Sequence, residues 1–481
     1  MAAAIMQTID TTIANVALPR MQGSLAATQD EISWVLTSYI VAAAITIPLT
    51  GWLAGRFGRR PVFLISIAGF TVASALCGIA TSINEIVFFR LLQGISGAAL
   101  LPLSQSILFD INTKENRGRA MAGWGMAVTL GPVIGPVVGG WFTDNYNWRW
   151  VFFINVPIGI FVLIGLLAVM PDTKKIFNRF DFFGFFSLAI SLGALQVMLD
   201  RGERQDWFNS NEIIIETIIM GMAFYLFLVH TLTHPRPFVS PKLFEDRNFI
   251  IANIFIFLVV GVLYATLALQ PPMLQNEMGY PVFTTGLVTA PRGLGMFFSM
   301  MFVGRIVGKI NTKIIITCGL LLSIIALWQM THFNLQMDAR PVIISGIIQG
   351  LGIGLIFVPI TIIAFTNTAP ELLNEATALF NLIRNIGSSI GISVLTAILV
   401  SKTQIMHANL SEHITPYSDN IPATEVGIAL LNAAITRQAA MVAYINDYKF
   451  MMVLIIVSIP LVLLIREPKI TAATEKVMVM D

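Results

Sequence analysis

Long apolar segments separated by short polar turns recur along almost the whole chain. A helix needs roughly 20 mainly apolar residues to cross a bilayer. By that measure the pattern predicts fourteen membrane-spanning helices, beginning near residues 2, 33, 62, 85, 119, 150, 181, 212, 249, 283, 314, 341, 376 and 448. Of the 481 residues, 56% are hydrophobic and only 12% are charged, which excludes an ordinary soluble globular protein. We therefore expect an all-α integral membrane protein.

One predicted span, residues 122–142, is unusually rich in glycine and proline. Small residues at four-residue spacing share one helical stripe, which holds Ala127, Gly131, Gly135 and Gly139. The neighbouring stripe holds Pro132, Pro136 and Gly140. In water such a helix is poor, since glycine costs about 1 kcal/mol and proline about 3 kcal/mol per interior position. In a bilayer the pattern indicates a smooth face against which another helix packs closely.

Basic residues gather in alternate turns between the predicted spans. Examples are the turns at residues 56–60, 114–119 and 305–313. This side of the membrane carries about 18 of the 29 Lys and Arg residues, so the positive-inside rule makes it cytoplasmic. Both termini are then expected in the cytoplasm. Because the first span carries an aspartate and lacks a basic leading region, we expect no cleavable signal peptide.

Two of these turns share one pattern of glycines followed by basic residues. Residues 51–60 read GWLAGRFGRR, and residues 304–313 read GRIVGKINTK. Their offset suits six spans plus an inserted pair of helices. We therefore expect two six-helix halves, residues 1–170 and 242–481, separated by a two-helix insertion at residues 171–241. Two halves with a cavity between them are typical of a secondary transporter.

The polar interruptions are short, with one exception. Residues 401–447 are expected to form an external loop that contains one helix, and this loop would serve as a lid or as a docking surface. The sequence has no phosphate-binding Gly-x-x-x-x-Gly-Lys-Ser/Thr motif and no soluble segment long enough for a nucleotidase domain. ATP hydrolysis within this chain is therefore excluded as an energy source.

Two charged residues inside predicted spans are candidates for proton coupling. A charge in a span costs about 2.5–3.5 kcal/mol on insertion scales, so Asp10 should face a cavity or a partner. The alternative is a polar residue near the cytoplasmic headgroups. Arg90 shares a stripe with Gly94 and Gly97 and should point into protein. Since arginine stays charged, Arg90 would either tune a carboxylate such as Asp10 or hydrogen-bond backbone carbonyls.

Four further polar residues are candidates to face a central cavity, namely Asn15, Gln93, Arg292 and Arg384. For the two arginines, contact with a substrate and a packing role are equal alternatives. No metal site is expected, because His230 and His234 have no third ligand nearby. The two cysteines, Cys77 and Cys318, lie in apolar segments and offer no disulfide framework.

Together these residues resemble, almost end to end, the fourteen-span drug:proton antiporters of the major facilitator superfamily. Asp10 to Pro19 resemble the first-span motif of that family, and Arg90 to Gly97 resemble its arginine motif. The cytoplasmic gating motif matches at Gly51, Gly55, Arg56, Gly58, Arg59 and Arg60. The antiporter motif matches at Gly131, Pro132, Gly135, Pro136, Gly139 and Gly140. Residues 148–159 and 199–207 resemble further hallmarks of the fourteen-span group.

One departure from the family pattern affects the gating motif. The family usually has an acid where this chain has Gly55, so a charge-relay latch at that position is in doubt. The antiporter motif is often preceded by a glycine that would fall at Ala122, beside Gly123, and this change is expected to be harmless.

The resemblance implies a proton-coupled exporter in the inner (plasma) membrane, with Asp10 and Arg90 in proton coupling. It implies no cofactor beyond the proton gradient, and apolar or amphipathic, often cationic, toxic substrates. It also implies a periplasmic adaptor and an outer-membrane channel as partners in tripartite efflux, docked at residues 401–447. Export of one endogenous metabolite, such as a siderophore, peptide or amino acid, is an alternative, and sodium coupling stays open. A membrane enzyme or receptor is disfavoured because no nucleophile–base set is present.

Overall fold

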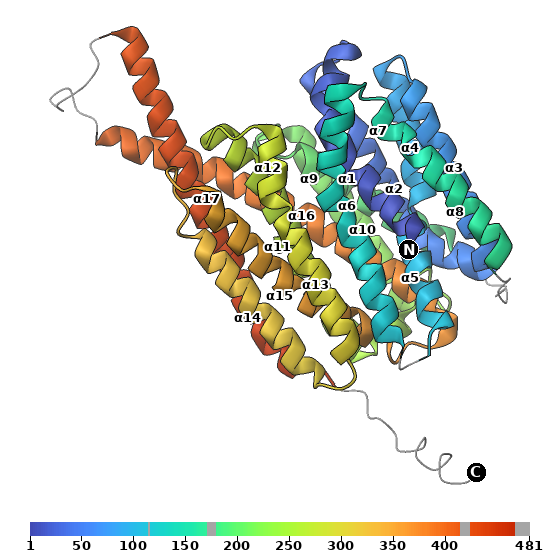
Figure 1. Cartoon of the computed structure of the whole chain (residues 1–481). Helices are drawn as coiled ribbons and strands as arrows, with labels where there is room; N and C mark the ends of the chain where they lie inside the picture. The colour runs from blue at the N-terminus through green and yellow to red at the C-terminus, as the bar shows by residue number, and fades with distance from the viewer. Residues whose placement is uncertain (114–115, 171–178, 414–423, 467–481) are drawn as a thin grey trace.

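The computed structural model describes residues 1–113, 116–170, 179–413 and 424–466, and these residues form a bundle of helices (Figure 1). The first helices in the chain are α1 (Ala2–Ser24), α2 (Gln29–Phe57), α3 (Arg59–Ile79), α4 (Ile83–Gly97), α5 (Leu100–Ile111), α6 (Arg117–Asn145), α7 (Trp150–Phe153) and α8 (Asn155–Val169). Next come α9 (Phe182–Arg201), η1 (Trp207–Asn209), α10 (Asn211–Thr233) and η2 (Pro241–Phe244). The last helices are α11 (Arg247–Pro272), the π-helical turn η3 (Met273–Glu277), α12 (Val282–Thr289), α13 (Pro291–Ile306), α14 (Thr312–Met330), α15 (Ala339–Phe365), η4 (Pro370–Leu372), α16 (Leu373–Glu412) and α17 (Glu425–Leu463).

Twelve helical segments in the described residues are long and apolar enough to cross a membrane. Five of these join consecutive helical elements, namely α4 with α5, α7 with α8, α11 with η3, α12 with α13, and η4 with α16. The 23-residue α1 and the 29-residue α6 are not among the twelve. Threonines and an aspartate lower the hydropathy of α1. The chain is thus a multi-pass membrane protein.

The helix expected within the external loop at residues 401–447 is present as the first part of α17, but the rest of the described segment is helical as well and not a loop. Residues 401–412 continue α16, and residues 425–447 belong to α17, so the last span begins well before residue 448. Residues 414–423 lie outside the described residues. Both helices are far longer than a bilayer requires, and α17 projects past the bundle at the upper left of Figure 1. The polar side chains suggested a loop, whereas good helix formers such as alanine and leucine carry the helix into water.

Helices from the two ends of the chain pack directly on one another. The faces of α6 contact α1 on one side and α13 on the other. The α2 helix contacts α16, and the inserted helix α9 packs on both of them. At the end of α9 the Thr37 hydroxyl donates to the Asp200 carboxylate, while the Ser393 hydroxyl donates to the Leu199 carbonyl at 2.6 Å. The inserted pair therefore bridges α2 and α16.

Candidate functional site

Asp10 is the centre of a buried polar cluster among α1, α4 and α8. The side chain is 0% exposed, yet both carboxylate oxygens accept hydrogen bonds. Arg90 Nη1 donates to Oδ2 at 2.7 Å, and Gln93 Nε2 donates to Oδ1 at 2.8 Å. Asn155 Nδ2 donates to Oδ1 at 2.7 Å. These three donors favour the charged carboxylate, which burial alone would not tolerate.

Arg90 is held as firmly as the carboxylate. Its Nε donates to the Val35 carbonyl at 3.0 Å, and Nη1 also donates to Gln93 Oε1 at 2.9 Å. The guanidinium carbon lies 4.3 Å from the centre of the Tyr39 ring, on its face. In such a buried pair, removing one partner leaves an uncompensated charge and costs about 3–5 kcal/mol. Arg90 therefore contacts both a carboxylate and a backbone carbonyl, the two roles that the sequence left open.

The glycine stripe of α6 positions α1 and hence Asp10. A methyl group built on Gly131 would overlap Thr8, one on Gly135 would overlap Thr12, and one on Gly139 would overlap Ile13. This close approach lets Thr12 Oγ1 donate to the Gly131 carbonyl at 3.0 Å. The antiporter motif therefore acts here as a packing surface for the helix that carries the buried acid.

The second stripe of α6 packs less closely on its neighbours. Pro132 lines a cavity, whereas Gly140 packs loosely on Val16, 4.0 Å from the nearest atom that an added methyl would meet. Pro136 lies on the same helix. The first stripe is thus a close packing face against α1, and Pro132 of the second stripe lines the cavity.

The gating motif lies where α2 ends and α3 begins. Gly58 separates the two helices with a φ of +93°, a conformation that favours glycine. Arg59 forms an ion pair with Asp110 of α5 and donates to Asn374 of α16, while Ser106 donates to the same Asn374 oxygen at 2.7 Å. Gly51 packs on the backbone of α16, because an added methyl there would lie 3.0 Å from the Glu375 Cα.

These contacts connect N-terminal helices to α16 although position 55 carries no acid. An added methyl on Gly55 would meet no atom within 4 Å. Arg56 lies in the last turn of α2, and Arg60 Nη2 donates to the Leu167 carbonyl at 3.0 Å. The Arg59–Asp110 pair and Asn374 therefore join α3, α5 and α16 at this turn.

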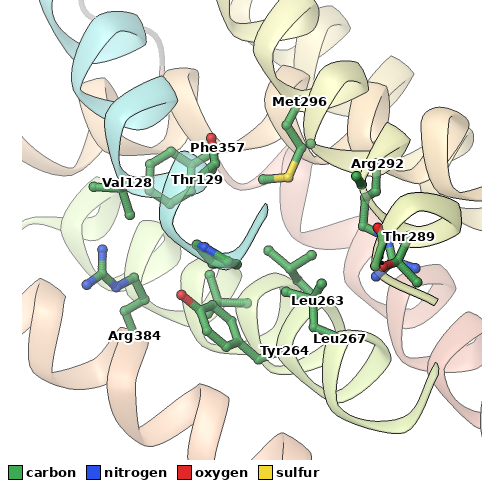
Figure 2. A pocket seen from close by; sticks show the side chains of 15 residues that line it. Val128, Thr129, Leu263, Tyr264, Leu267, Thr289, Arg292, Met296, Phe357 and Arg384 are labelled. Carbon is green, nitrogen blue, oxygen red and sulfur yellow. Dashed lines mark hydrogen bonds between the residues drawn. The ribbon is translucent and has the colours of Figure 1, made fainter. Parts of the chain in front are cut away.

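A cavity lies between α6 and the C-terminal helices (Figure 2). Its empty volume is about 730 Å³, including the open mouth. The residues that line it are Val128, Thr129, Pro132, Val260, Leu263, Tyr264, Leu267, Gly286, Thr289, Ala290, Arg292, Gly293, Met296, Phe357 and Arg384. Most of them are apolar or aromatic, as in the binding pockets of small organic molecules.

Both cavity arginines are buried, and no carboxylate among the described residues pairs with either of them. Arg292 is 3% exposed and Arg384 is 5% exposed. Arg292 donates through Nη2 to Gln270, but within the described part of the chain Nε and Nη1 have no partner, and neither does Arg384 Nη1. No acid is among the lining residues. Donors that are buried without partners are costly, so this cavity is suited to a ligand that brings acceptors.

The structure separates the four residues that were candidates to face the cavity. Arg292 and Arg384 line it, whereas Gln93 belongs to the Asp10 cluster. Asn15 is exposed and lies outside the lining set. Among the described residues no group of three His, Cys, Asp or Glu side chains could hold a metal ion. His230 instead contacts Asp181 at 2.9 Å.

Sequence reasoning missed one buried acid, Asp447. It is 0% exposed in α17, with Tyr444 and Tyr448 on the same helix, also buried. It was missed because the last span was expected to start at residue 448, which left Asp447 in a loop. A helical pattern that keeps alanine, tyrosine and methionine on one face before residue 448 is the signal that could have found it.

A helical membrane bundle with a buried charge pair and a cavity between helices from the two ends of the chain defines a secondary transporter. The sequence model of the Major Facilitator Superfamily matches residues 1–392, and the chain belongs to this family.

The relatives support this assignment. The Multidrug export protein EmrB of Escherichia coli (strain K12) is 38% identical over 424 residues, which cover 88% of this chain and 83% of EmrB. The Fatty acid resistance protein FarB of Neisseria gonorrhoeae is 36% identical over 479 residues, covering 97% of this chain and 94% of FarB. The structure of the human organic anion transporter MFSD10 (TETRAN) matches with a TM-score of 0.59 at 14% identity, covering 94% of this chain and 98% of that one. The last match shows the fold alone.

Proposed function

We propose that this protein exports hydrophobic or amphipathic toxic compounds across the inner membrane in exchange for protons. Relatives named for multidrug export and fatty acid resistance support the export of such compounds. The observation that carries the proton coupling is the fully buried Asp10, paired with Arg90 at 2.7 Å. A carboxylate in that position can gain and lose a proton as its surroundings change during alternating access.

The Asp10 cluster supports a simple order of events. Protonation of Asp10 from outside removes its charge and weakens the hydrogen bonds from Arg90, Gln93 and Asn155. Arg90 stays charged and retains its bond to the Val35 carbonyl. When the site opens to the cytoplasm the proton leaves and the cluster forms again. A shift of α1 along the glycine face of α6 would transmit this change to the cavity, because Pro132 on α6 lines the cavity wall.

Fourteen spans are the topology that best fits the bundle. We infer that α1 and α6 cross the membrane together with the twelve apolar segments, since they pack on one another and on neighbouring spans. The halves would be residues 1–170 and 242–481, with residues 171–241 inserted, and both termini in the cytoplasm. The end that carries Arg59 and the other basic turns would then be cytoplasmic, and its closure by Asn374 corresponds to an outward-facing state.

The cavity favours acidic amphiphiles among the possible substrates. Two buried arginines without an acid among the lining residues repel a cation and attract a carboxylate or sulfonate. The expectation of cationic substrates from the family resemblance therefore does not suit this cavity. Export of a single acidic metabolite is the alternative, and the same two arginines would serve it.

The long outer ends of α16 and α17 are the surface that we propose for partners. They extend past the membrane-spanning length and expose apolar side chains such as Val426, Ile428 and Leu430. An EmrA-like periplasmic adaptor, continuing to an outer-membrane channel, is the partner implied by the family resemblance.

Transport by the purified protein in liposomes with an internal pH dye tests this function. The probes are anilinonaphthalene sulfonate, a permanently anionic amphiphile, and ethidium, a permanent cation. Wild type should move protons when the anion is added, Asp10→Asn should not, and Glu203→Gln, which changes an exposed turn acid, should behave as wild type. Proton movement that persists in Asp10→Asn would overturn the assigned carrier. If wild type moves no protons with either probe, the proposed function is wrong.

A further inference from the structure

The C-terminal helices contain a second buried carboxylate that the Asp10 mechanism does not use. Asp447 lies in α17 and is 0% exposed. Within the described part of the chain, neither of its carboxylate oxygens has a hydrogen-bond partner. Asp10, equally buried, accepts three hydrogen bonds. The two acids therefore have opposite surroundings in one conformation.

Because Asp447 is buried without a partner, this conformation favours the neutral acid over the charged carboxylate. A charged carboxylate needs hydrogen bonds or an opposite charge when water is excluded, and Asp447 has neither. A neutral carboxylic acid avoids most of that cost. If this side chain only filled space, an apolar side chain of similar volume would make the folded protein more stable. Packing alone therefore does not explain a carboxyl group at this position.

Under the proposed topology Asp447 lies nearer the outer side of the membrane. Sixteen residues separate Asp447 from Leu463 at the end of α17, or about 24 Å along the helix, so it lies toward the opposite, outer face of a bilayer core of about 30 Å. The π-helical turn η3 packs on α17 there, and a turn of this type is common at functional sites. Its Glu277 carbonyl accepts from Arg437 of α17.

The titratable neighbours connect this acid to the cavity. Tyr444 and Tyr448 lie on its own helix, and η3 contributes Glu277, which is electrostatically close to Tyr444. Tyr448 lies within electrostatic range of both Asp447 and the cavity residue Arg292, and its hydroxyl is 3.7 Å from Met273 Sδ. The described parts of α11, α14 and α16 place no charged group beside the carboxyl.

We propose that Asp447 is a second proton-carrying carboxylate, so that each exported substrate is exchanged for two protons, one on Asp10 and one on Asp447. The inference rests on the proposed proton-coupled export. In the outward-facing state a carboxylate oxygen of Asp447 takes a proton from external water. The helices then close around the neutral acid. In the inward-facing state the proton passes to cytoplasmic water and the carboxylate remains. The two acids lie on different helices, Asp10 on α1 and Asp447 on α17.

The coupling ratio tests the proposal. Full-length protein in liposomes is held at zero membrane potential with valinomycin and potassium, and the pH gradient that stops net anilinonaphthalene sulfonate flux is measured. Against a tenfold probe gradient, two protons balance at about half a pH unit and one proton at about one pH unit. Wild type should balance at about half a unit, Asp447→Asn at about one unit, and Asp447→Glu as wild type. Asparagine copies the shape of the protonated acid, so the fold should be retained.

Each result of this experiment has a definite meaning. If net flux through wild type stops at a gradient of about one pH unit, only one proton is exchanged and the second site is overturned. This result needs no variant, so it tests the proposal even if Asp447→Asn fails to fold. An unchanged ratio in Asp447→Asn overturns it as well, while the loss of exchange in Asp10→Asn would keep the proposed function intact. A wild-type flux that no pH gradient can stop overturns proton coupling, and the second site with it.

Discussion

Among the described residues, buried charges are paired in the N-terminal part of the bundle and lack such partners in the C-terminal part. Around Asp10 every charged group has a partner, since Arg90 bonds the carboxylate, a glutamine and a backbone carbonyl. Among the C-terminal helices, Arg292, Arg384 and Asp447 each have buried polar atoms with no partner among the described residues. The charged groups of the first centre are paired with one another, whereas those of the second lack partners that a substrate or a proton would supply.

This difference indicates a division of labour. A cluster whose charged groups are paired and hydrogen-bonded resists rearrangement until a proton removes one of the charges. Buried donors without acceptors favour any ligand that offers them, and a cavity of mixed aromatic and aliphatic side chains tolerates many shapes. Stability should therefore depend on the Asp10 centre, and substrate selection on the arginine cavity. The predictions below test that separation by the size of the stability change.

The largest loss of stability is expected for Arg90→Ala. Removing the guanidinium leaves the Asp10 carboxylate buried with only neutral donors, which costs about 3–5 kcal/mol. Thermal unfolding in detergent, followed by size-exclusion fluorescence, should show a midpoint far below wild type. The double variant Asp10→Asn with Arg90→Ala should recover part of the loss, because no uncompensated carboxylate remains. A double variant less stable than Arg90→Ala would show that the pair does not act as a unit.

A smaller loss is expected for Asn155→Leu, which keeps the volume of the side chain. Asn155 donates to Asp10 Oδ1 at 2.7 Å and to Ser74 Oγ at 3.0 Å. A hydrogen bond to a charged group contributes about 1.5–3 kcal/mol, so the unfolding midpoint should fall by less than in Arg90→Ala. The same substitution in an Asp10→Asn background should have little further effect. Equal losses in the two backgrounds would mean that Asn155 acts through packing.

Much of the fold was predictable from the sequence because its signals are local. Apolar length indicated the spans, and four-residue spacing indicated that Gly131, Gly135 and Gly139 share a packing face. Asp10 could be identified from the sequence because it is a charged residue within an apolar segment. What could not be predicted depends on contacts distant in sequence, such as the hydrogen bond from Arg59 to Asn374. Asp447 was not recognised as a buried acid for a simpler reason, because the polar residues before it suggested a loop.

Packing between α1 and α6 gives the third prediction. Gly135→Ala would place a methyl group on Thr12, whereas Gly140→Ala meets its nearest atom at 4.0 Å. Both changes raise helix propensity equally, so their difference reports the overlap. Forced overlap in a packed interface costs about 1–3 kcal/mol. Gly135→Ala should therefore unfold at a lower temperature than Gly140→Ala and transport more slowly, since it displaces the helix that carries Asp10. Equal midpoints would contradict the packing role of the stripe.

The smallest change in stability, and the sharpest contrast with Arg90, is expected for Arg292→Met. Arg292 is buried with one hydrogen bond, to Gln270, and no acid beside it in the cavity. Replacing an uncompensated buried charge with an apolar side chain of similar volume is neutral or stabilising, so the unfolding midpoint should stay level or rise.

Transport by Arg292→Met should nevertheless change with the charge of the substrate. Loss of charge-assisted bonds of about 1.5–3 kcal/mol corresponds to roughly a 10- to 150-fold rise in the KM for anilinonaphthalene sulfonate. The KM for ethidium should be unchanged or lower, because the repelling charge is gone. A variant that loses stability, or loses both probes equally, would show that Arg292 is a structural anchor like Arg90. The two parts of the bundle would then handle buried charge in the same way, and substrate selection would have to lie outside this cavity.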